Sequence, residues 1–303
     1  RLGVGMQSLG LAEVAYQNSL DYAKERLQGR ALTGPKHADK PADPIIEHPD
    51  VRRMLLTQKA YVEAARAFTY WAGLAIDFEH KHPDPQVRQD NADMVSLLTP
   101  VVKGFITDNG YESTTLAMQV LGGHGYIVES GLEQHVRDAR INMIYEGTNT
   151  IQAMDLLGRK VLGDMGAKLM KFGREIDQLV AMHAANPAMQ EFTAPLAALW
   201  GEVQTVTAEI GQKALSNPDD AGAAAVPYLR LIGHLVFSFA WCFAVGVALR
   251  KLPADGSAGD PFYTAKLATA RFYFARLYPE TAALLRQVRA GSAPLMALSP
   301  EMF

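Results

Sequence analysis

The chain has 303 residues, of which 49% are hydrophobic and 20% are charged, as in an ordinary globular protein with one large domain or two smaller ones. Its formal net charge is −3 and it has no long basic run, so we expect no general affinity for nucleic acid. The single cysteine, Cys242, excludes an internal disulfide and fits a reducing compartment, so we expect a cytoplasmic protein.

The first predicted element is a helix over residues 2–28, closed by Gly29. It follows Arg1 directly, without a leader-like segment, so we expect either a processed chain or a fragment of a longer one. Prolines within 29–50 exclude regular helix there and predict a long loop. From 51 to 76, apolar residues recur at intervals of three and four, which indicates an amphipathic helix.

Two more helices complete this part of the chain. After a break at 82–85, a third helix runs to the glycine pair at 122–123, and a fourth begins near Asn149. The inward face expected for the fourth helix consists of Ile151, Met154, Leu157 and Val161. Four long helices with one extended crossover loop predict a four-helix bundle.

Beyond the bundle the pattern resets, and three or four further helices are predicted, with breaks at 186–187, 217–220 and 253–260. The last helix, near 261–288, contains the run RFYFARLY, whose aromatic residues we interpret as core packing rather than as a ligand cage. The predicted fold class is therefore all-α, with 164–303 as a second helical unit packed on the first.

Residues 231–249 carry no formal charge and approach the ~20 apolar residues that a membrane span requires. His234, Ser238 and Cys242 interrupt this stretch, and no other segment resembles a second span. A helix buried on all sides inside a bundle is equally apolar all round. We therefore favour a buried helix and expect no membrane span.

The segment LGGHGYI at 121–127 does not have the G-x-G-x-x-G spacing of a dinucleotide fingerprint, and a helix precedes it where a strand should be. A glycine cap on the third helix is the simpler interpretation, although a further glycine would also allow close approach of a backbone. His124 lacks partners at metal-ligand spacing, so no metal site is predicted. For His135 and 137–140, RDAR, we favour a salt-bridged turn over a charge relay.

Two interpretations of Glu146, in MIYEGTNTIQ at 143–152, are open. Asn149 can cap the fourth helix with Gln152 as its reciprocal partner, and Glu146 would then be an anion favoured by the helix dipole. Alternatively, Gly147 leaves its backbone N–H free to meet a ligand. A carboxylate base beside two free amide donors is what removal of a proton alpha to a thioester requires.

Taken together, QVLGGHGY and RDARINMIYEGTNTIQ strongly resemble the C-terminal helical domain of the acyl-CoA dehydrogenase family. The resemblance spans roughly 1–160, including DYAKER at 21–26, and it implies a four-helix domain over 1–163. Residues 164–303 resemble the additional helical domain of a larger, mainly bacterial branch that includes the 3-methylmercaptopropionyl-CoA dehydrogenases. The family's N-terminal helical domain and middle β-barrel are not in this chain, which implies the C-terminal half of a longer enzyme.

The resemblance implies an FAD-dependent α,β-dehydrogenation of an acyl-CoA to a trans-2-enoyl-CoA, with Glu146 as the catalytic base. The backbone amide of Glu146 would bind the thioester carbonyl, and Gly147 and Arg1 would lie at the substrate. The implied cofactor-binding residues are Arg26, Gln119, Gly122, Gly123, Thr148 and Thr150. All of these but the two threonines match positions that reach the FAD of a neighbouring subunit. Thr150 stands where the family usually has Glu or Gln, and His48 lies near the position of a Gln that often contacts FAD.

The same resemblance implies an electron-acceptor flavoprotein as partner and a homodimer or homotetramer. An acyl-CoA oxidase shares the Glu-Gly pair and is an alternative, and a DNA-binding alkylation-response flavoprotein of this fold is another. The latter predicts a basic patch within 164–303, where charges are mixed. By itself the fragment is expected to be inactive, as a helical oligomerisation module.

Overall fold

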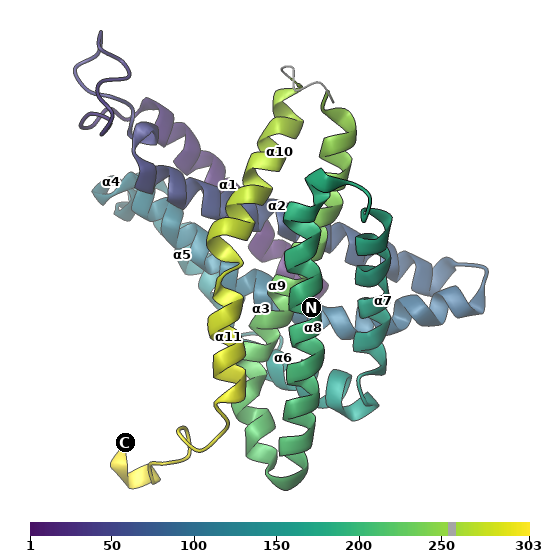
Figure 1. Ribbon diagram of the computed structural model, residues 1–303. Coiled ribbons are helices and arrows are strands. Elements are labelled where there is room, and N and C mark those ends of the chain that lie inside the picture. The colour runs from purple at the N-terminus through teal and green to yellow at the C-terminus, as the bar shows by residue number, and fades with distance from the viewer. Residues whose placement is uncertain (254–258) are drawn as a thin grey trace.

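The computed structural model describes residues 1–253 and 259–303, and helices make up nearly all of its regular structure (Figure 1). Within those residues the only β-type pairing is an isolated bridge between Leu27 and Pro44. The predicted all-α class is therefore confirmed. The middle of the break predicted at 253–260 lies outside the described residues.

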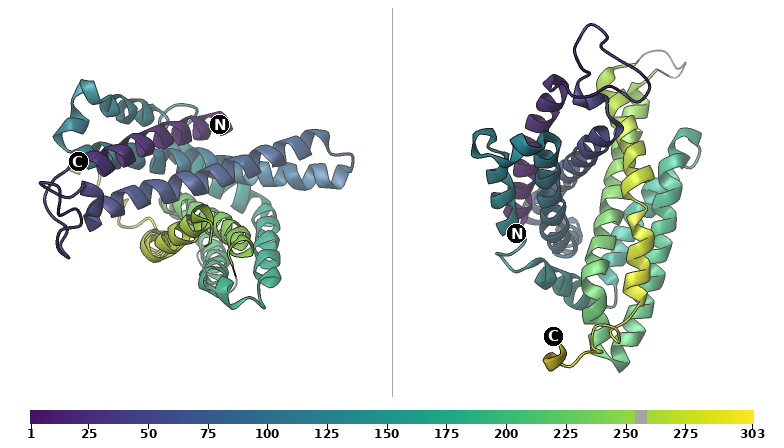
Figure 2. Two further views of the ribbon diagram at one scale, coloured as in Figure 1. Left: turned by 90° about the horizontal axis from the view of Figure 1, so that it is seen from above. Right: turned by 90° about the vertical axis from the view of Figure 1, so that its left-hand side faces the viewer.

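The first three long helices form one layer, α1 (Leu2–Glu25), α2 (Pro49–Lys81) and α3 (Pro85–Leu121), and they lie side by side in both views of Figure 2. Proline occupies the first turn of α2 and of α3, where its missing N–H breaks no helical hydrogen bond. The side chain of Asp84 caps α3 by accepting from the Gln86 N–H at 2.8 Å.

The first helix ends at Glu25, so the prediction that it continues to residue 28 was wrong. Arg26 has extended backbone, because Leu27 pairs with Pro44 across the long loop that the prolines predicted. Asp43 organises this loop: its carboxylate accepts from the backbone N–H groups of Ala31, Lys36 and His37 at 2.9, 3.0 and 2.8 Å. A short 3-10 turn, η1 (Ile45–Glu47), leads into α2.

Short elements follow the layer. They are α4 (Gly123–Tyr126), the 3-10 turn η2 (Val128–Ser130), α5 (Leu132–Ile141), α6 (Asn149–Met154), the π-helix η3 (Asp155–Val161) and the 3-10 turn η4 (Leu162–Asp164). Gly122, with φ 59°, ends α3 as the predicted glycine cap. Residues 137–140 lie within α5, so the salt-bridged turn expected there was wrong; Asp138 accepts a hydrogen bond from Gln134 at 2.7 Å.

The fourth helix begins at Asn149 as predicted, but only half of its expected inward face is buried. Leu157 and Val161 are buried, whereas Ile151 and Met154 are 50% and 40% exposed. The chain changes to a π-helix at Asp155, and the wider turn shifts the phase of a 3.6-residue pattern. The prediction of the inward face was wrong for these two residues because it used one helical period for the whole segment.

The second part of the chain consists of long helices. They are α7 (Ala167–Met182), α8 (Pro187–Ser216), α9 (Pro218–Lys251), α10 (Pro261–Phe272), the π-helix η5 (Tyr273–Leu277) and α11 (Glu280–Arg289), followed by the 3-10 turn η6 (Pro300–Met302). Asn186 and Asn217 cap α8 and α9, so the breaks predicted at 186–187 and 217–220 are confirmed. The final residues extend away from the helices (Figures 1 and 2).

Helix α9 joins the two parts. It is long and apolar enough to cross a membrane, but 72% of its most apolar window is buried inside the protein, as the buried-helix interpretation predicts. The left view of Figure 2 shows α1–α3 from the side and α8–α11 nearly end-on, so the two sets of helices cross steeply. At the crossing, the rings of Phe105 on α3 and Phe237 on α9 pack edge-to-face with centroids 4.9 Å apart.

One apolar core runs through both parts. It includes Phe68 and Phe105 from the first layer and Phe192 and Trp241 from the second part. Tyr273 is fully buried against Trp241, which confirms that the aromatic run packs in the core. Because this core is continuous, the domain boundary at 163/164 stays a prediction.

Candidate active site

Glu146 lies in the short loop between α5 and α6, and its backbone is unusual. Glu146 and Gly147 have φ angles of 57° and 83°, so two consecutive residues are left-handed. For a residue with a side chain this conformation costs about 1–2 kcal/mol, and such residues cluster at functional sites. The Glu146 side chain is exposed and has no ion-pair partner within the part of the chain that the structure describes. Its carboxylate is therefore free to meet a ligand.

The backbone beside this carboxylate is also free. Among the described residues, the N–H groups of Glu146 and Gly147 have no hydrogen-bond acceptor. A hydrogen bond from the Tyr145 N–H to the Ile141 carbonyl at 3.2 Å holds the loop before them, and one from the Asn149 N–H to the Met143 carbonyl at 3.1 Å holds it after them. The loop thus combines a carboxylate and two unpaired amide donors.

Gln152 holds the loop from inside the protein. Its side chain is fully buried, and Nε2 donates to the carbonyl oxygens of Glu146 at 3.1 Å and Gly147 at 3.3 Å. The cap is Thr148, whose hydroxyl accepts from the Ile151 N–H at 3.4 Å. The expected reciprocal cap formed by Asn149 and Gln152 was therefore wrong, because the Gln152 amide pairs with carbonyl oxygens of the loop and the Asn149 amide pairs with polar groups of α3.

Asn149 ties the end of the loop to α3. Its amide nitrogen donates to the Gly104 carbonyl at 3.2 Å, to the Thr107 hydroxyl at 3.0 Å and to the Asp108 carboxylate. Its amide oxygen accepts from the Lys103 ammonium at 2.7 Å. Sequence reasoning missed Lys103, although one charged residue within the apolar run TPVVKGFI is a usable signal.

The Lys103 side chain is fully buried beneath the loop. Burial lowers the pKa of Lys103; the charge of Asp108 opposes this effect, and the charge of Arg1 adds to it. Arg1 itself is paired with Asp155, with Nη1 and Oδ2 2.8 Å apart, and Arg159 binds the other oxygen of Asp155 at 2.9 Å. Arg1 therefore lies within electrostatic reach of the same cluster, and its substrate contact stays a prediction.

The other predicted cofactor residues form a second group at the far end of α3. Gln119, Gly122 and Gly123 are exposed, and a Cβ added to either glycine would meet no atom within 4 Å. A 3.5 Å contact from the Tyr22 hydroxyl to Nδ1 of His124 brings the last turn of α1, and with it Arg26, to this end.

The two groups are well separated along the helix. At about 1.5 Å per residue, the anchor of the Glu146 loop at Asp108 lies roughly 17 Å from Gln119. Thr148 and Thr150 are exposed at the start of α6, next to Glu146. His48 is occupied by a contact of its Nε2 to the Gln28 carbonyl at 2.8 Å. One extended ligand or two separate ones would be needed to contact both groups.

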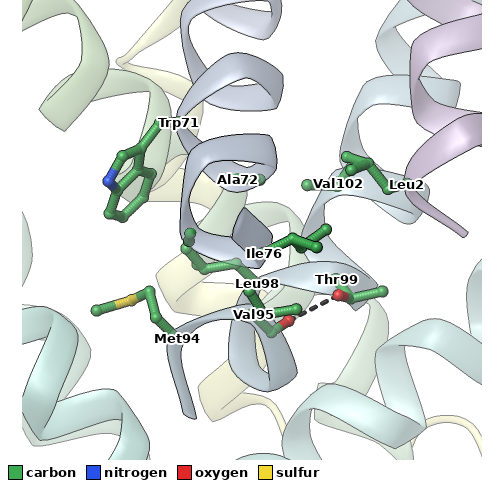
Figure 3. Close-up of a pocket in the computed structure, with 10 residues that line it drawn as sticks. Leu2, Trp71, Ala72, Ile76, Met94, Val95, Leu98, Thr99 and Val102 are labelled. Carbon is green, nitrogen blue, oxygen red and sulfur yellow. Dashed lines mark hydrogen bonds between the residues drawn. The ribbon is translucent and has the colours of Figure 1, made fainter. Parts of the chain in front are cut away.

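A small pocket at the start of α1 has a different character (Figure 3). Leu2, Trp71, Met94 and Val102 are among its mainly apolar lining residues, and the Thr99 hydroxyl is used in a 2.6 Å hydrogen bond to the Val95 carbonyl. With its one lining hydroxyl already paired, this pocket is a packing defect between α1, α2 and α3 rather than a site for chemistry.

Comparison with protein families gives two matches. Residues 1–162 match the model described as "Acyl-CoA dehydrogenase, C-terminal domain", and residues 172–299 match "Acetyl-CoA dehydrogenase C-terminal like". The chain is 38% identical to a 3-methylmercaptopropionyl-CoA dehydrogenase of Ruegeria pomeroyi over 93% of this chain and 47% of the relative. It is 34% identical to the broad-specificity linear acyl-CoA dehydrogenase FadE5 of Mycobacterium tuberculosis over 92% of this chain and 47% of the relative.

Solved structures show the same fold. An acyl-CoA dehydrogenase of Bacillus anthracis, in complex with FAD, superposes with a TM-score of 0.74 at 19% identity, over 100% of this chain and 49% of that one. ACDH-11 of Caenorhabditis elegans, in complex with C11-CoA, gives a TM-score of 0.72 at 17% identity, over 91% and 42%. The chain thus spans about half the length of the curated relatives it matches.

Proposed function

The chain belongs to the acyl-CoA dehydrogenase family, and we propose that it is the C-terminal half of an enzyme that oxidises an acyl-CoA thioester to a trans-2-enoyl-CoA with FAD. The observation that carries the proposal is the Glu146 loop. An exposed carboxylate and two free N–H groups lie on consecutive residues, in a conformation that the side-chain amides of Gln152 and Asn149 hold from behind.

In the proposed reaction, Glu146 removes the proton from the carbon alpha to the thioester carbonyl. The carbonyl oxygen of the thioester gains negative charge as the proton leaves. The N–H groups of Glu146 and Gly147 would donate hydrogen bonds to that oxygen. Donors that are already in place stabilise that charge without reorganising. Because Gln152 and Asn149 hold the loop, little conformational entropy remains to be lost when substrate binds.

Bound FAD would supply the acceptor for the hydride that leaves the beta carbon. The residues of this chain fit such a cofactor in two places. Near the base, Thr148 and Thr150 would offer hydroxyl groups at the start of α6. At the other end of α3, Arg26 and Gln119 would contact the FAD of a neighbouring subunit, beside the open backbone of Gly122 and Gly123, where no side chain obstructs a phosphate. The roughly 17 Å from Asp108 to Gln119 along α3 can be spanned by one extended cofactor or by parts of two, and a site shared between two subunits is what the family resemblance implies.

Two alternatives receive less support. The curated relatives that match most of this chain, at 32–38% identity, are named dehydrogenases, whereas the acyl-CoA oxidases resemble this chain in fold at 14–16% identity. For DNA binding, several arginines of the second part are already paired with carboxylates, including Arg230 with Glu280 and Arg271 with Glu191. A dehydrogenase with an electron-acceptor flavoprotein as partner is therefore our proposal.

The test uses the complete polypeptide that contains this chain, purified with FAD. A panel of straight, branched and sulfur-containing acyl-CoA substrates is assayed with an artificial electron acceptor, and flavin bleaching is followed without oxygen. We expect Glu146→Gln to bind acyl-CoA normally but to lose at least 100-fold in turnover, since a general base typically contributes that much. Glu129→Gln, which removes another exposed carboxylate, is the matched control and is expected to keep full activity.

Normal bleaching by Glu146→Gln would remove Glu146 from the proposed role. Rapid reoxidation of the reduced flavin by air, with formation of hydrogen peroxide, would identify an oxidase instead.

A further inference from the structure

The second part of the chain places one arginine against α3. Arg230, on α9, is held by Glu280 of α11: Nη2 lies 2.8 Å from Oε2, and Nε donates to Oε1. The remaining Nη1 donates to the Asn109 side chain of α3 at 3.3 Å, and the guanidinium carbon lies 5.6 Å from the centre of the Phe105 ring. Arg230 thus connects α11 with α3.

Buried groups hold this ion pair in turn. His234 is fully buried; its Nε2 contacts the Glu280 carboxylate at 3.0 Å, and its Nδ1 contacts the Tyr273 hydroxyl at 3.0 Å. Burial alone would raise the pKa of Glu280, but the hydrogen bonds from His234 and Arg230 lower it to about 2. Glu280 is therefore ionised at neutral pH, and a bidentate pair of this kind fixes orientation as well as distance.

The turn of α3 that contains Asn109 also anchors the loop of the proposed active site. Asn109 follows Asp108, whose carboxylate accepts from Asn149 at the end of the Glu146 loop. Burial raises the pKa of Asp108, while the hydrogen bond from Asn149 and the charge of Arg230 favour its ionised form. Arg230 therefore acts on both residues of the turn, on Asn109 by a hydrogen bond and on Asp108 by charge.

Apolar packing already joins the two parts of the chain, so the polar contacts are not needed merely to hold them together. The edge-to-face contact of Phe105 with Phe237 packs α3 against α9 but does not orient the polar side chains of the turn. A forked guanidinium that binds a carboxylate on one side and an amide on the other orients the Asn109 side chain directly. The contact is suited to setting the position of the turn at Asp108 and Asn109.

We propose that Arg230 is a positioning residue: together with Glu280, it fixes the Asp108–Asn109 turn of α3 and through Asn149 the loop that carries Glu146. The second part of the chain then takes part in shaping the active site. The effect on catalysis rests on the proposed function, whereas the coupling between Arg230 and the loop does not.

The experiment compares Arg230→Met with Arg271→Met in the complete polypeptide. Arg271 forms an exposed ion pair with Glu191 within the second part and serves as the matched control. Amide hydrogen exchange of the peptide covering 142–152 is measured by mass spectrometry. We expect exchange there to become several-fold faster in Arg230→Met and to stay unchanged in Arg271→Met, with both proteins folded by circular dichroism.

The activity arm separates positioning from stability. We expect Arg230→Met to lower kcat about tenfold with little change in KM, since a small misplacement of a reacting group costs rate more than binding. Arg230→Lys, which keeps the charge, is expected to restore part of kcat. Unchanged loop exchange in a folded Arg230→Met protein would overturn the inference, as would equal effects of Arg271→Met. If the loop loosens but the wild-type protein has no acyl-CoA activity, the coupling holds and the proposed function fails.

Discussion

Two turns of this protein present backbone to solvent, and they are built in opposite ways. The turn at Glu146 and Gly147 is clamped from below by the buried amide of Gln152 and by Asn149. The turn at Gly122 and Gly123 has open space where any side chain would stand.

The difference matches what each turn is proposed to do. A base must meet one C–H bond in one geometry, so the loop that carries it benefits from a rigid support. Contact with the phosphates of an extended cofactor requires access more than rigidity, and glycine backbone gives that access. Strain at Glu146 is thus paired with strong local restraints, whereas the left-handed conformation at Gly122 is carried by a residue without a Cβ.

Among the changes considered for the turn at Glu146 and Gly147, the loss of the Asn149 side chain should lower the free energy of unfolding most. In Asn149→Leu the buried Lys103 ammonium loses its hydrogen-bond acceptor, and we expect a loss of about 3 kcal/mol in the free energy of unfolding. Urea unfolding followed by circular dichroism measures this loss. The double variant Lys103→Met with Asn149→Leu should recover much of it, because removing both partners is far less costly than removing one. No recovery in the double variant would show that Lys103 does not depend on Asn149.

Replacing one glycine of each turn by alanine should also distinguish the two turns, with smaller losses in the free energy of unfolding. In Gly147→Ala the residue keeps φ near 83° and its Cβ would lie 2.8 Å from Nε2 of Gln152, so we expect a loss of about 1–3 kcal/mol. In Gly123→Ala no atom lies within 4 Å and the φ angle is not left-handed, so we expect a change below about 0.5 kcal/mol. Thermal unfolding of both variants measures the contrast, and equal losses would contradict it.

Lowering the pH should loosen the region near the Gly122 turn before it loosens the Glu146 loop. Of the three predictions, this one involves the smallest change in the free energy of unfolding. Asp43 holds the loop 29–48, whose η1 packs near the open turn through Ile45 and Leu121. The backbone N–H of Ala31 is the main cause that lowers the pKa of Asp43 well below its usual value, with further contributions from His37, Lys36 and Arg30, against the effect of burial.

Because the folded pKa of Asp43 is depressed, its stabilising contribution is present above about pH 4 and is lost as the pH falls further. We therefore expect the protection factors of hydrogen exchange in 29–43, which are corrected for the pH dependence of the intrinsic rate, to fall below about pH 4, before those in 142–149, whose loop is held mainly by amides that do not titrate. Asp43→Asn at neutral pH should reproduce the acid effect on 29–43. Simultaneous loosening of both segments would argue that one global transition governs them.

Local patterns were sufficient for much of the fold. Asn-Pro signals placed the starts of α8 and α9, and the helical period identified the long helices, although α2 begins at Pro49, within the segment 29–50 that was assigned to the loop. The helical period wrongly predicted that Ile151 and Met154 face inward, because a π-helix begins at Asp155 and the sequence pattern did not indicate it. The end of α1 was misplaced for a similar reason, since Leu27 leaves the helix to pair with Pro44 across the loop.

By itself, the sequence determined the all-α class, the order of the helices, the family and the choice of Glu146 as the candidate base. Only the tertiary structure decided that Asn149 and Gln152 serve as clamps instead of caps, that Lys103 lies beneath the loop, and that Arg230 reaches α3. Helix formation depends on neighbours three and four positions away, which a sequence displays directly. Which buried polar groups meet depends on how distant helices cross, because each donor is satisfied by whatever acceptor the packing brings within reach.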